Sequence, residues 1–308
     1  MIAENVAGVG IDIGGTNIKY VAALPDGTTL VSGVLPTSDA PEAAAYWVKC
    51  VRTLLADLRQ ELGITLYPGV ASPGLPAADG SSIHWMRGRM ESVQGLNWTQ
   101  ALEAMHSVPV LNDAHAALMG EVWCGAALGS KNAIMYTLGT GVGGACLVDG
   151  RLLRGHLSRA GHLGHVSLNA DADLDIVNTP GSLEDAIGEC TLASRTSGRF
   201  SSTRAMLEAV AEGDADAEAV WQISVKALAA AVISAVNVLD PETVIIGGGI
   251  AAAGDALYVP LKRWMEAFEW RPTGTTVKVT AARLGEFSGA SGAACAALEA
   301  VGIIRPGT

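Results

Sequence analysis

Residues 8–24 read GVGIDIGGTNIKYVAAL, and this stretch decides the fold class of the 308-residue chain. A glycine-punctuated β run from Val6 to Ile13 ends at the turn Gly14-Gly15-Thr16, after which residues 18–24 return as a second strand. Another turn, Pro25-Asp26-Gly27, leads into a third strand over residues 28–35. The stretch therefore predicts an antiparallel meander that opens an α/β domain.

The same order of elements returns in the second half of the chain. Residues 133–150 read AIMYTLGTGVGGACLVDG, which predicts a strand, a glycine turn at 139–144, a returning strand and a second turn before residues 151–153. We interpret this as an internal duplication, with two lobes that each begin with a glycine-turn hairpin. The turn formally matches GxGxxG, but a dinucleotide-binding fold needs a helix next, whereas a strand follows here. The sequence also lacks GxxxxGK[ST], which excludes a P-loop enzyme.

Helical spacing of apolar residues predicts the connecting segments. The expected helices span residues 41–62, 97–105, 114–125, 221–239 and 289–300. The apolar segment Ala227–Leu239 is too short to cross a bilayer, and the N-terminus has no basic region before an apolar stretch. We therefore expect a cytoplasmic protein with no membrane partner.

Composition narrows the function classes. Hydrophobic residues make up 49% of the chain and charged residues 17%, so a large core is possible and wholesale disorder is excluded. The formal net charge of −11 and the absence of a Lys/Arg run argue against a nucleic-acid partner. The five cysteines are isolated, and we expect buried apolar thiols in a reducing compartment.

The first glycine turn has the residue types of a phosphate site. Consecutive glycines let backbone N–H groups approach phosphate oxygens, and a hydroxyl can add another hydrogen bond. A carboxylate at the strand end could hold Mg²⁺ through water, and a lysine could face a phosphate or simply be solvated. Taken alone, the stretch could equally be a plain hairpin turn. The candidate nucleotide residues here are Asp12, Gly14, Gly15, Thr16 and Lys19.

Two further glycine features extend this nucleotide site. Each follows a predicted strand, and a nucleotide between two lobes needs two turns around its phosphates and one glycine bend flat against its adenosine. The second turn contributes Gly139, Thr140 and Gly141, and the bend at residues 247–249 contributes Gly248 and Gly249.

Asp113 is the candidate catalytic base. It follows a buried strand and precedes a helix, which points its carboxylate into a cleft. Phosphoryl transfer to an alcohol needs a base near the attacking hydroxyl. Asn112 offers both a donor and an acceptor, which suits a polyol. The alternative from this segment alone is that Asp113 is only the N-cap of its helix.

A histidine cluster follows the second hairpin. His156, His162 and His165 lie in a glycine-rich stretch without a nearby cysteine, which favours hydrogen bonding to a hydroxylated ligand over a metal site. Glu184 and Asp185 follow at the expected start of a helix, as helix-start acids or ligand acceptors.

Six segments, in this order and spacing, resemble the ROK family (repressor, open reading frame, kinase) of bacterial sugar kinases over nearly the whole chain. They are GIDIGGTNIKYVAAL, ASPGLP, PVLNDAHAALMGE, YTLGTGVGGACLVDG, AGHLGHVSL and VIIGGGI. The resemblance implies an actin-like ATPase (ribonuclease H-like) α/β duplication, with a nucleotide and sugar cleft between its lobes. We assign residues 1–118 and about 289–308 to a small N-terminal lobe, and residues 119–288 to a large C-terminal lobe.

The resemblance also implies residue roles. Asp113 would take the proton of the sugar 6-hydroxyl, while Gly74, Asn112, His165 and Glu184 would contact the sugar. The three glycine features would bind ATP with Mg²⁺. Relatives in this family are commonly dimers or tetramers, and we expect a homodimer here.

The chain departs from the family pattern in two places. The family usually carries a zinc module, CxCGxxGCxE, but Asp175, Val177 and Ser182 stand where its cysteines belong. We therefore expect no structural zinc and a loop held by packing instead. The family often has a glutamate near the sugar 2-hydroxyl, where this chain has His162. The resemblance therefore leaves recognition of the 2-position open, and it does not imply that glucose is the substrate.

Two alternative functions stay open at this point. One is a catalytically idle sensor of sugar or nucleotide, against which the intact Asp113 and glycine turns argue. The other is a sugar-responsive regulator, against which the acidic charge and the short segment before Asp12 argue. The sequence leaves open which hexose, aminosugar or cyclitol is the substrate, and whether ATP or polyphosphate is the donor.

Overall fold

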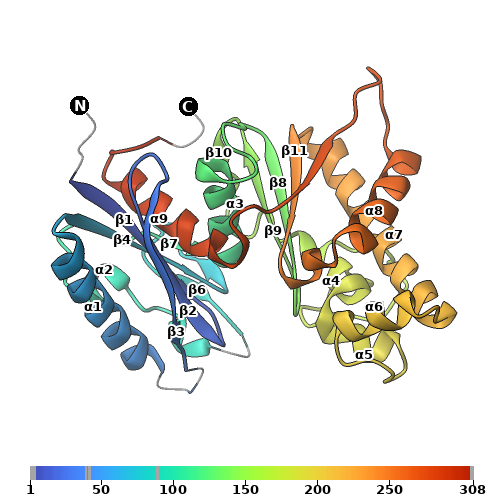
Figure 1. Cartoon of the computed structure of the whole chain (residues 1–308), viewed down its shortest axis with the longest axis horizontal. Coiled ribbons are helices and arrows are strands. Elements are labelled where there is room, and N and C mark those ends of the chain that lie inside the picture. Colours follow the sequence, from blue (N-terminus) through green and yellow to red (C-terminus); the bar gives the residue numbers. More distant parts are fainter. Residues whose placement is uncertain (1–4, 39, 41–42, 88–89, 306–308) are drawn as a thin grey trace. The chain divides into compact units, whose positions relative to one another are not determined.

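The computed structural model describes residues 5–38, 40, 43–87 and 90–305. The chain forms two compact units, each assembled from separate segments (Figure 1). The first comprises Met1–Lys131, Asp149–Ala160 and Ala282–Thr308, and the second comprises Asn132–Val148 and Gly161–Ala281. The expected lobe boundary at residue 118 falls inside helix α3 (Asp113–Cys124), which the structure keeps whole in the first unit.

The sheet of the first unit contains the expected meander. Its strand order is β3-β2-β1-β4-β7. The hairpins β1–β2 and β2–β3 are antiparallel, whereas β4 pairs parallel with β1 and β7 pairs parallel with β4. The strands are β1 (Val6–Ile13), β2 (Asn17–Ala23), β3 (Thr29–Pro36), β4 (Thr65–Ser72) and β7 (Val110–Asn112). In β1, Asp12 lies opposite Lys19 of β2.

Two long helices pack on the two faces of this sheet (Figure 1). Val9 and Ile11 of β1 belong to one core cluster with residues of α1 (Ala43–Leu62). The alternate position Gly10 faces α9 (Ser288–Ala300), where a Cβ would clash with the backbone of Ala290. This side-chain alternation is that of a strand, and the glycines let α9 approach the sheet closely.

Short elements complete the first unit. They are β5 (Leu75–Pro76), β6 (Ile83–Trp85), η1 (Glu91–Val93), α2 (Trp98–Ala101), β10 (Arg151–Leu152) and η5 (Gly285–Phe287). The prediction of a helix over residues 97–105 is wrong in length. Glu103 has a positive φ of 51°, a left-handed conformation that ends the helix after one turn.

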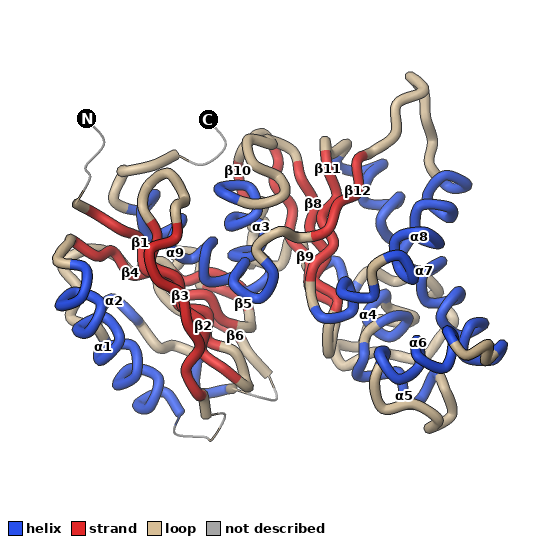
Figure 2. The backbone as a smooth tube through the Cα atoms, viewed as in Figure 1, coloured by secondary structure: helices blue, strands red, loops and turns tan. Residues whose placement is uncertain are grey.

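The second unit repeats the topology of the first, which confirms the predicted duplication. Figure 2 shows the strands of its sheet in red, with the order β9-β8-β11-β12 among the strands of this unit. β8 and β9 form an antiparallel hairpin, and β11 and β12 add in parallel, as β4 and β7 do in the first unit. The strands are β8 (Ala133–Leu138), β9 (Val142–Val148), β11 (Thr243–Gly247) and β12 (Lys278–Ala281).

Helices and short turns form the rest of the second unit. They are η2 (Leu163–His165), α4 (Leu183–Ile187), η3 (Glu189–Thr191), α5 (Leu192–Arg195), α6 (Thr203–Ala211), α7 (Ala215–Leu239), η4 (Gly249–Ala253) and α8 (Asp255–Phe268). α7 starts six residues earlier than expected, because Asp214 caps its N-terminus by accepting a hydrogen bond from the Ala217 N–H at 2.9 Å.

Helix α7 is long and apolar enough to cross a membrane by length and composition alone. The prediction that this part of the chain is too short to cross a bilayer is therefore wrong. Within the second unit, however, α7 is bound to its neighbours. The Trp221 indole donates to the Ala256 carbonyl at 2.8 Å, and the Tyr136 hydroxyl donates to the Ala231 carbonyl at 3.2 Å. Its buried face includes Trp221, Val225 and Leu228, which is the pattern of a core helix.

The five cysteines are free thiols, as the sequence predicted. Cys146 and Cys295 are buried, whereas Cys50 and Cys124 are half-buried. Cys190 is exposed, which corrects the expectation of a buried thiol at that position.

Candidate active site

Asp113 and Asn112 lie where β7 ends and α3 begins. Asn112 is the N-cap of α3, because its Oδ1 accepts hydrogen bonds from the N–H groups of Ala114 at 3.0 Å and His115 at 3.3 Å. Its side-chain amide donates to the Gly74 carbonyl at 3.1 Å. Asn112 therefore joins two of the segments that the sequence assigned to the sugar.

Asp113 occupies the first position of α3, so the alternative that it is the N-cap residue is wrong. Its Oδ1 does accept a hydrogen bond from the Ala114 N–H at 2.8 Å, which orients the carboxylate at the helix start. The side chain is exposed, unlike that of the buried Asn112. An oriented carboxylate open to solvent is the geometry a general base needs.

Asp12 lies close enough to Asp113 for the two carboxylates to influence each other. Burial raises the pKa of Asp12 to about 7, repulsion from Asp113 adds to the rise, and Lys19 opposes it. The Asp12 carboxylate also faces the first turn of α9, where a Cβ on Gly289 would lie 2.6 Å from Oδ2. Two neighbouring carboxylates of this kind attract a cation.

The carboxylate oxygens suit Mg²⁺, which takes one or two carboxylates and keeps several waters. The described residues contain no group of three His, Cys, Asp or Glu side chains placed to enclose a metal. Asp12 therefore fits a magnesium ion that would be held through water and by the phosphates of a nucleotide, and not an all-protein cage.

The turn between β1 and β2 is closed by a hydrogen bond from the Gly14 N–H to the Asn17 carbonyl at 3.0 Å. Gly15 is half-buried and Thr16 is exposed at its tip. Lys19 forms an ion pair with Glu286 at 3.5 Å, with 26% of the lysine side chain and 60% of the glutamate side chain exposed. Lys19 therefore has a protein partner, and the pair is open to solvent and weak.

The second glycine turn is held by Glu184 of α4. The Val142 N–H donates to Glu184 Oε2 at 2.9 Å, and a Cβ on Gly141 would clash with this same carboxylate. The Glu189 N–H donates to the Gly139 carbonyl at 3.0 Å, and the Cys190 N–H donates to the Thr140 carbonyl at 2.8 Å. The sequence assigned Glu184 to the sugar and did not predict its contact with the second glycine turn.

Gly139 and Gly249, expected to serve one ligand, line the same cavity of about 590 Å³ in the second unit. This volume is in the range of small-molecule sites. Gly248 precedes Gly249 with a positive φ of 86°, so the chain bends sharply as it leaves β11. The cavity wall also includes α6 residues that no sequence motif marks, which are Thr203, Arg204, Leu207, Glu208 and Ala211.

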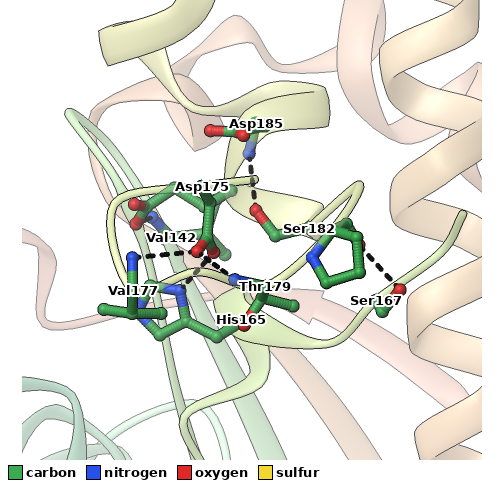
Figure 3. A network of polar contacts seen from close by, with 10 residues as sticks. Val142, His165, Ser167, Asp175, Val177, Thr179, Ser182 and Asp185 are labelled. Atoms are coloured by element: carbon green, nitrogen blue, oxygen red, sulfur yellow. Dashed lines mark hydrogen bonds and ion pairs between the residues drawn. The ribbon is translucent and has the colours of Figure 1, made fainter. Parts of the chain in front are cut away.

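His165 ends the short helix η2, and its ring Nδ1 lies 2.9 Å from Asp175 Oδ2 (Figure 3). His162 is the N-cap residue of η2, so the two histidines flank one helical turn. His156 is exposed and belongs to the first unit. The contact of His165 with Asp175 is not visible in sequence spacing, because the loop between them brings the two together.

The donors of this loop do not suit zinc. Val177 has no ligating atom, and both oxygens of Asp175 already accept hydrogen bonds. The expectation that packing holds the loop is wrong, because Leu174 is 62% exposed and Ile176 is 75% exposed. Hydrogen bonds to Asp175 hold it instead.

Known proteins are similar to this chain over most of its length. The model of the ROK family matches residues 8–300. The glucokinase of Halalkalibacterium halodurans is 28% identical over 92% of each chain. The N-acetylmannosamine kinase of Vibrio cholerae is 29% identical over 88% of this chain and 92% of its own.

Solved structures are similar over the same length. The ROK hexokinase of Thermus thermophilus superposes with a TM-score of 0.83 at 28% identity, covering 96% of this chain and 99% of its own. Its similarity, like that of the sequence relatives, extends over both units.

Proposed function

The chain belongs to the ROK family and is a sugar kinase with the actin-like ATPase fold, and from this premise we propose that it phosphorylates the 6-hydroxyl of a hexose, with Asp113 as general base. The observation that carries the proposal is the placement of Asp113. Its carboxylate is exposed at the start of α3, oriented by the Ala114 N–H and beside the buried, capping Asn112.

Asp113 would accept the proton of the attacking hydroxyl as that oxygen bonds to the terminal phosphorus of ATP and the bond to the departing ADP breaks. Asp12 would hold Mg²⁺ through water, and bound Mg²⁺ neutralises charge on the phosphates. The proximity of Asp113 to Asp12 supports a cation at Asp12, because repulsion from Asp113 raises the pKa of Asp12 and a bound cation would offset that repulsion.

The glycine turns support the nucleotide assignment. Gly14, Gly15 and Thr16 would contact phosphate oxygens on the first unit, and Gly139, Thr140 and Gly141 would do so on the second. Gly248 and Gly249 would lie against the adenosine in the cavity that α6 lines. Lys19 would neutralise phosphate charge once the weak pair with Glu286 opens.

The sugar would contact Gly74, Asn112, His165 and Glu184. His162, in place of the family glutamate, would face the group at the 2-position of the ring. The named relatives act on glucose and on N-acetylmannosamine, which differ at this position, so the substrate class we propose is a hexose or an N-acetylhexosamine. A regulatory role is not favoured, because the sequence relatives described above are kinases.

We also propose that the protein acts in the cytoplasm as a homodimer, without nucleic-acid or membrane partners and without structural zinc. The acidic charge of −11 supports the absence of a nucleic-acid partner, and the buried face of α7 supports the absence of a membrane partner.

A coupled assay of ADP release over hexoses, N-acetylhexosamines, aminosugars and cyclitols tests the function, with polyphosphate as an alternative donor. We expect sugar-dependent ADP release with at least one hexose or N-acetylhexosamine, and a ³¹P–¹H correlation from the product phosphate to the hydrogens on carbon 6. A product phosphorylated at another hydroxyl, or ADP release that does not depend on sugar, would contradict the proposal.

A further inference from the structure

The loop over residues 166–182 wraps around a single buried carboxylate, that of Asp175 (Figure 3). Its side chain is 0% exposed. Oδ1 accepts hydrogen bonds from the Val177 N–H at 2.9 Å and the Thr179 N–H at 2.8 Å, while Oδ2 meets His165 Nδ1 at 2.9 Å. Both oxygens are therefore engaged, and they join the loop to the end of η2.

The backbone closes around the same residue. The Asp175 N–H donates to the Thr179 carbonyl at 2.9 Å, and the Asn178 N–H donates to the Asp175 carbonyl at 3.0 Å. Burial by itself raises the pKa of Asp175, but the donors from Thr179, His165, Val177 and Ser182 outweigh it and hold the pKa below its ordinary value. The carboxylate is therefore ionised at neutral pH and can only accept hydrogen bonds.

An ionised acceptor determines where the imidazole proton lies. The proton shared with Asp175 must be on His165 Nδ1, and a neutral ring carries only one N–H. Nε2 is then an acceptor, which can receive a hydrogen bond from a hydroxyl. The side chain of His165 is 28% exposed, whereas that of Asp175 is wholly buried, so the histidine is the member of the pair within reach of a ligand.

We propose that Asp175 is a positioning residue for the sugar site: its carboxylate holds His165 with Nδ1 protonated and Nε2 open to a sugar hydroxyl, and organises the loop over residues 166–182 without a metal. The proposal rests on the proposed function, in that His165 contacts the sugar. Asp175 touches neither substrate and acts only through His165 and the loop.

Asp175→Asn tests this role. The amide oxygen can still accept from the N–H groups of Val177 and Thr179, but its NH₂ group replaces Oδ2 and donates to the ring. His165 Nδ1 must then accept, and Nε2 becomes the donor. Long-range ¹H–¹⁵N correlations report the tautomer, with the signals assigned through His165→Gln. We expect a protonated Nδ1 in the wild type and a protonated Nε2 in the variant.

The kinetic expectation is a split between KM and kcat. The KM for sugar rises about ten-fold in Asp175→Asn, because Nε2 can no longer accept from the sugar hydroxyl, whose hydrogen must turn away and lose this partner. The kcat changes by less than about three-fold and the KM for ATP is unchanged, since the base and the nucleotide residues stay in place.

Ser167→Ala is the matched control. It removes the hydrogen bond from the Ser167 hydroxyl to the Pro180 carbonyl, at 2.7 Å, in the same loop without touching His165 (Figure 3). We expect wild-type tautomer and KM. Asp175→Glu, which keeps the carboxylate, should keep Nδ1 protonated and have a sugar KM nearer the wild type than Asp175→Asn.

Several results would overturn the proposal. A wild-type His165 protonated on Nε2 would do so without any variant, as would one equivalent of tightly bound zinc that Asp175→Asn releases. An active enzyme whose His165→Gln variant keeps its sugar KM would remove the positioning role. Failure of the proposed function looks different: no sugar is phosphorylated, while the tautomer experiment still gives the expected ring state.

Discussion

The two glycine turns belong to two hairpins of the same topology, but the charged residues around them differ. In the first unit, Ile13 pairs with Ile18 across a four-residue turn, and Asp12 lies opposite Lys19. In the second unit, Leu138 pairs with Val142 across a three-residue turn, and the neutral Thr137 lies opposite Gly143. The first hairpin carries its own carboxylate, whereas the second receives one from Glu184 of another helix.

This difference shows how two copies of one topology can differ in the roles of their carboxylates. Asp12 is destabilised in its ionised form by burial and by Asp113, and a cation bound there would offset this cost. Glu184 is occupied with the Val142 N–H, so in the second turn the carboxylate sets the backbone. We therefore expect substitutions in the first turn to affect the chemical step and those in the second to affect nucleotide binding.

The strongest test of this division is Asp113→Asn. Loss of the base should lower kcat by roughly 10²–10⁴-fold while ATP binding stays largely intact. Steady-state kinetics and a fluorescent ATP analogue measure the two effects. Asp57→Asn, the same change on the exposed face of α1, serves as the matched control. Near wild-type turnover in Asp113→Asn would exclude this residue as the base.

Gly141→Ala and Gly14→Ala compare the two turns directly. A Cβ at position 141 meets the Glu184 carboxylate, so the turn must move, and we expect the KM for ATP to rise about ten-fold, equivalent to ~1.4 kcal/mol. At position 14 the nearest atom to an added Cβ is the Asn17 carbonyl oxygen at 3.1 Å, so the effect should be smaller. Equal effects would mean that Glu184 does not restrain the second turn.

The smallest effect concerns the stability of the ligand-free protein. Asp12 has a pKa of about 7 when folded, against an ordinary value of 3.8, so the folded state keeps a proton that the unfolded state loses. The free energy of unfolding therefore falls as the pH rises from about 4 to about 7, and the full cost of ionising the buried Asp12 is present above pH 7. Asp12→Asn removes this ionisation cost.

We expect Asp12→Asn to unfold at a temperature about 2 °C above the wild type at pH 8, equivalent to about 1 kcal/mol after solvent screening of a half-buried group. The difference should shrink toward pH 5. Differential scanning calorimetry without nucleotide measures it. A difference independent of pH would mean that the Asp12 pKa is not raised.

Local signals predicted the hairpins, the long helices and the duplication. The strand–turn–strand order of residues 8–24 depends on glycine and β-strand patterns that neighbours in sequence determine. The errors occurred where a local signal was weak or absent. Residues 97–105 continue an apolar pattern, yet Glu103 leaves the helical conformation, and the Asp214 cap lies seven residues before the apolar pattern that begins at Trp221.

Taken alone, the sequence determined the architecture, the family and the position of Asp113 at a strand-to-helix junction, because periodicity and turn chemistry act over a few residues. Only the tertiary structure decided that Asn112 caps α3 in place of Asp113, that Glu184 holds the second turn, and that Asp175 holds His165. Those contacts join residues that loops bring together, and a hydrogen bond depends on distance in space, which spacing along the chain does not specify.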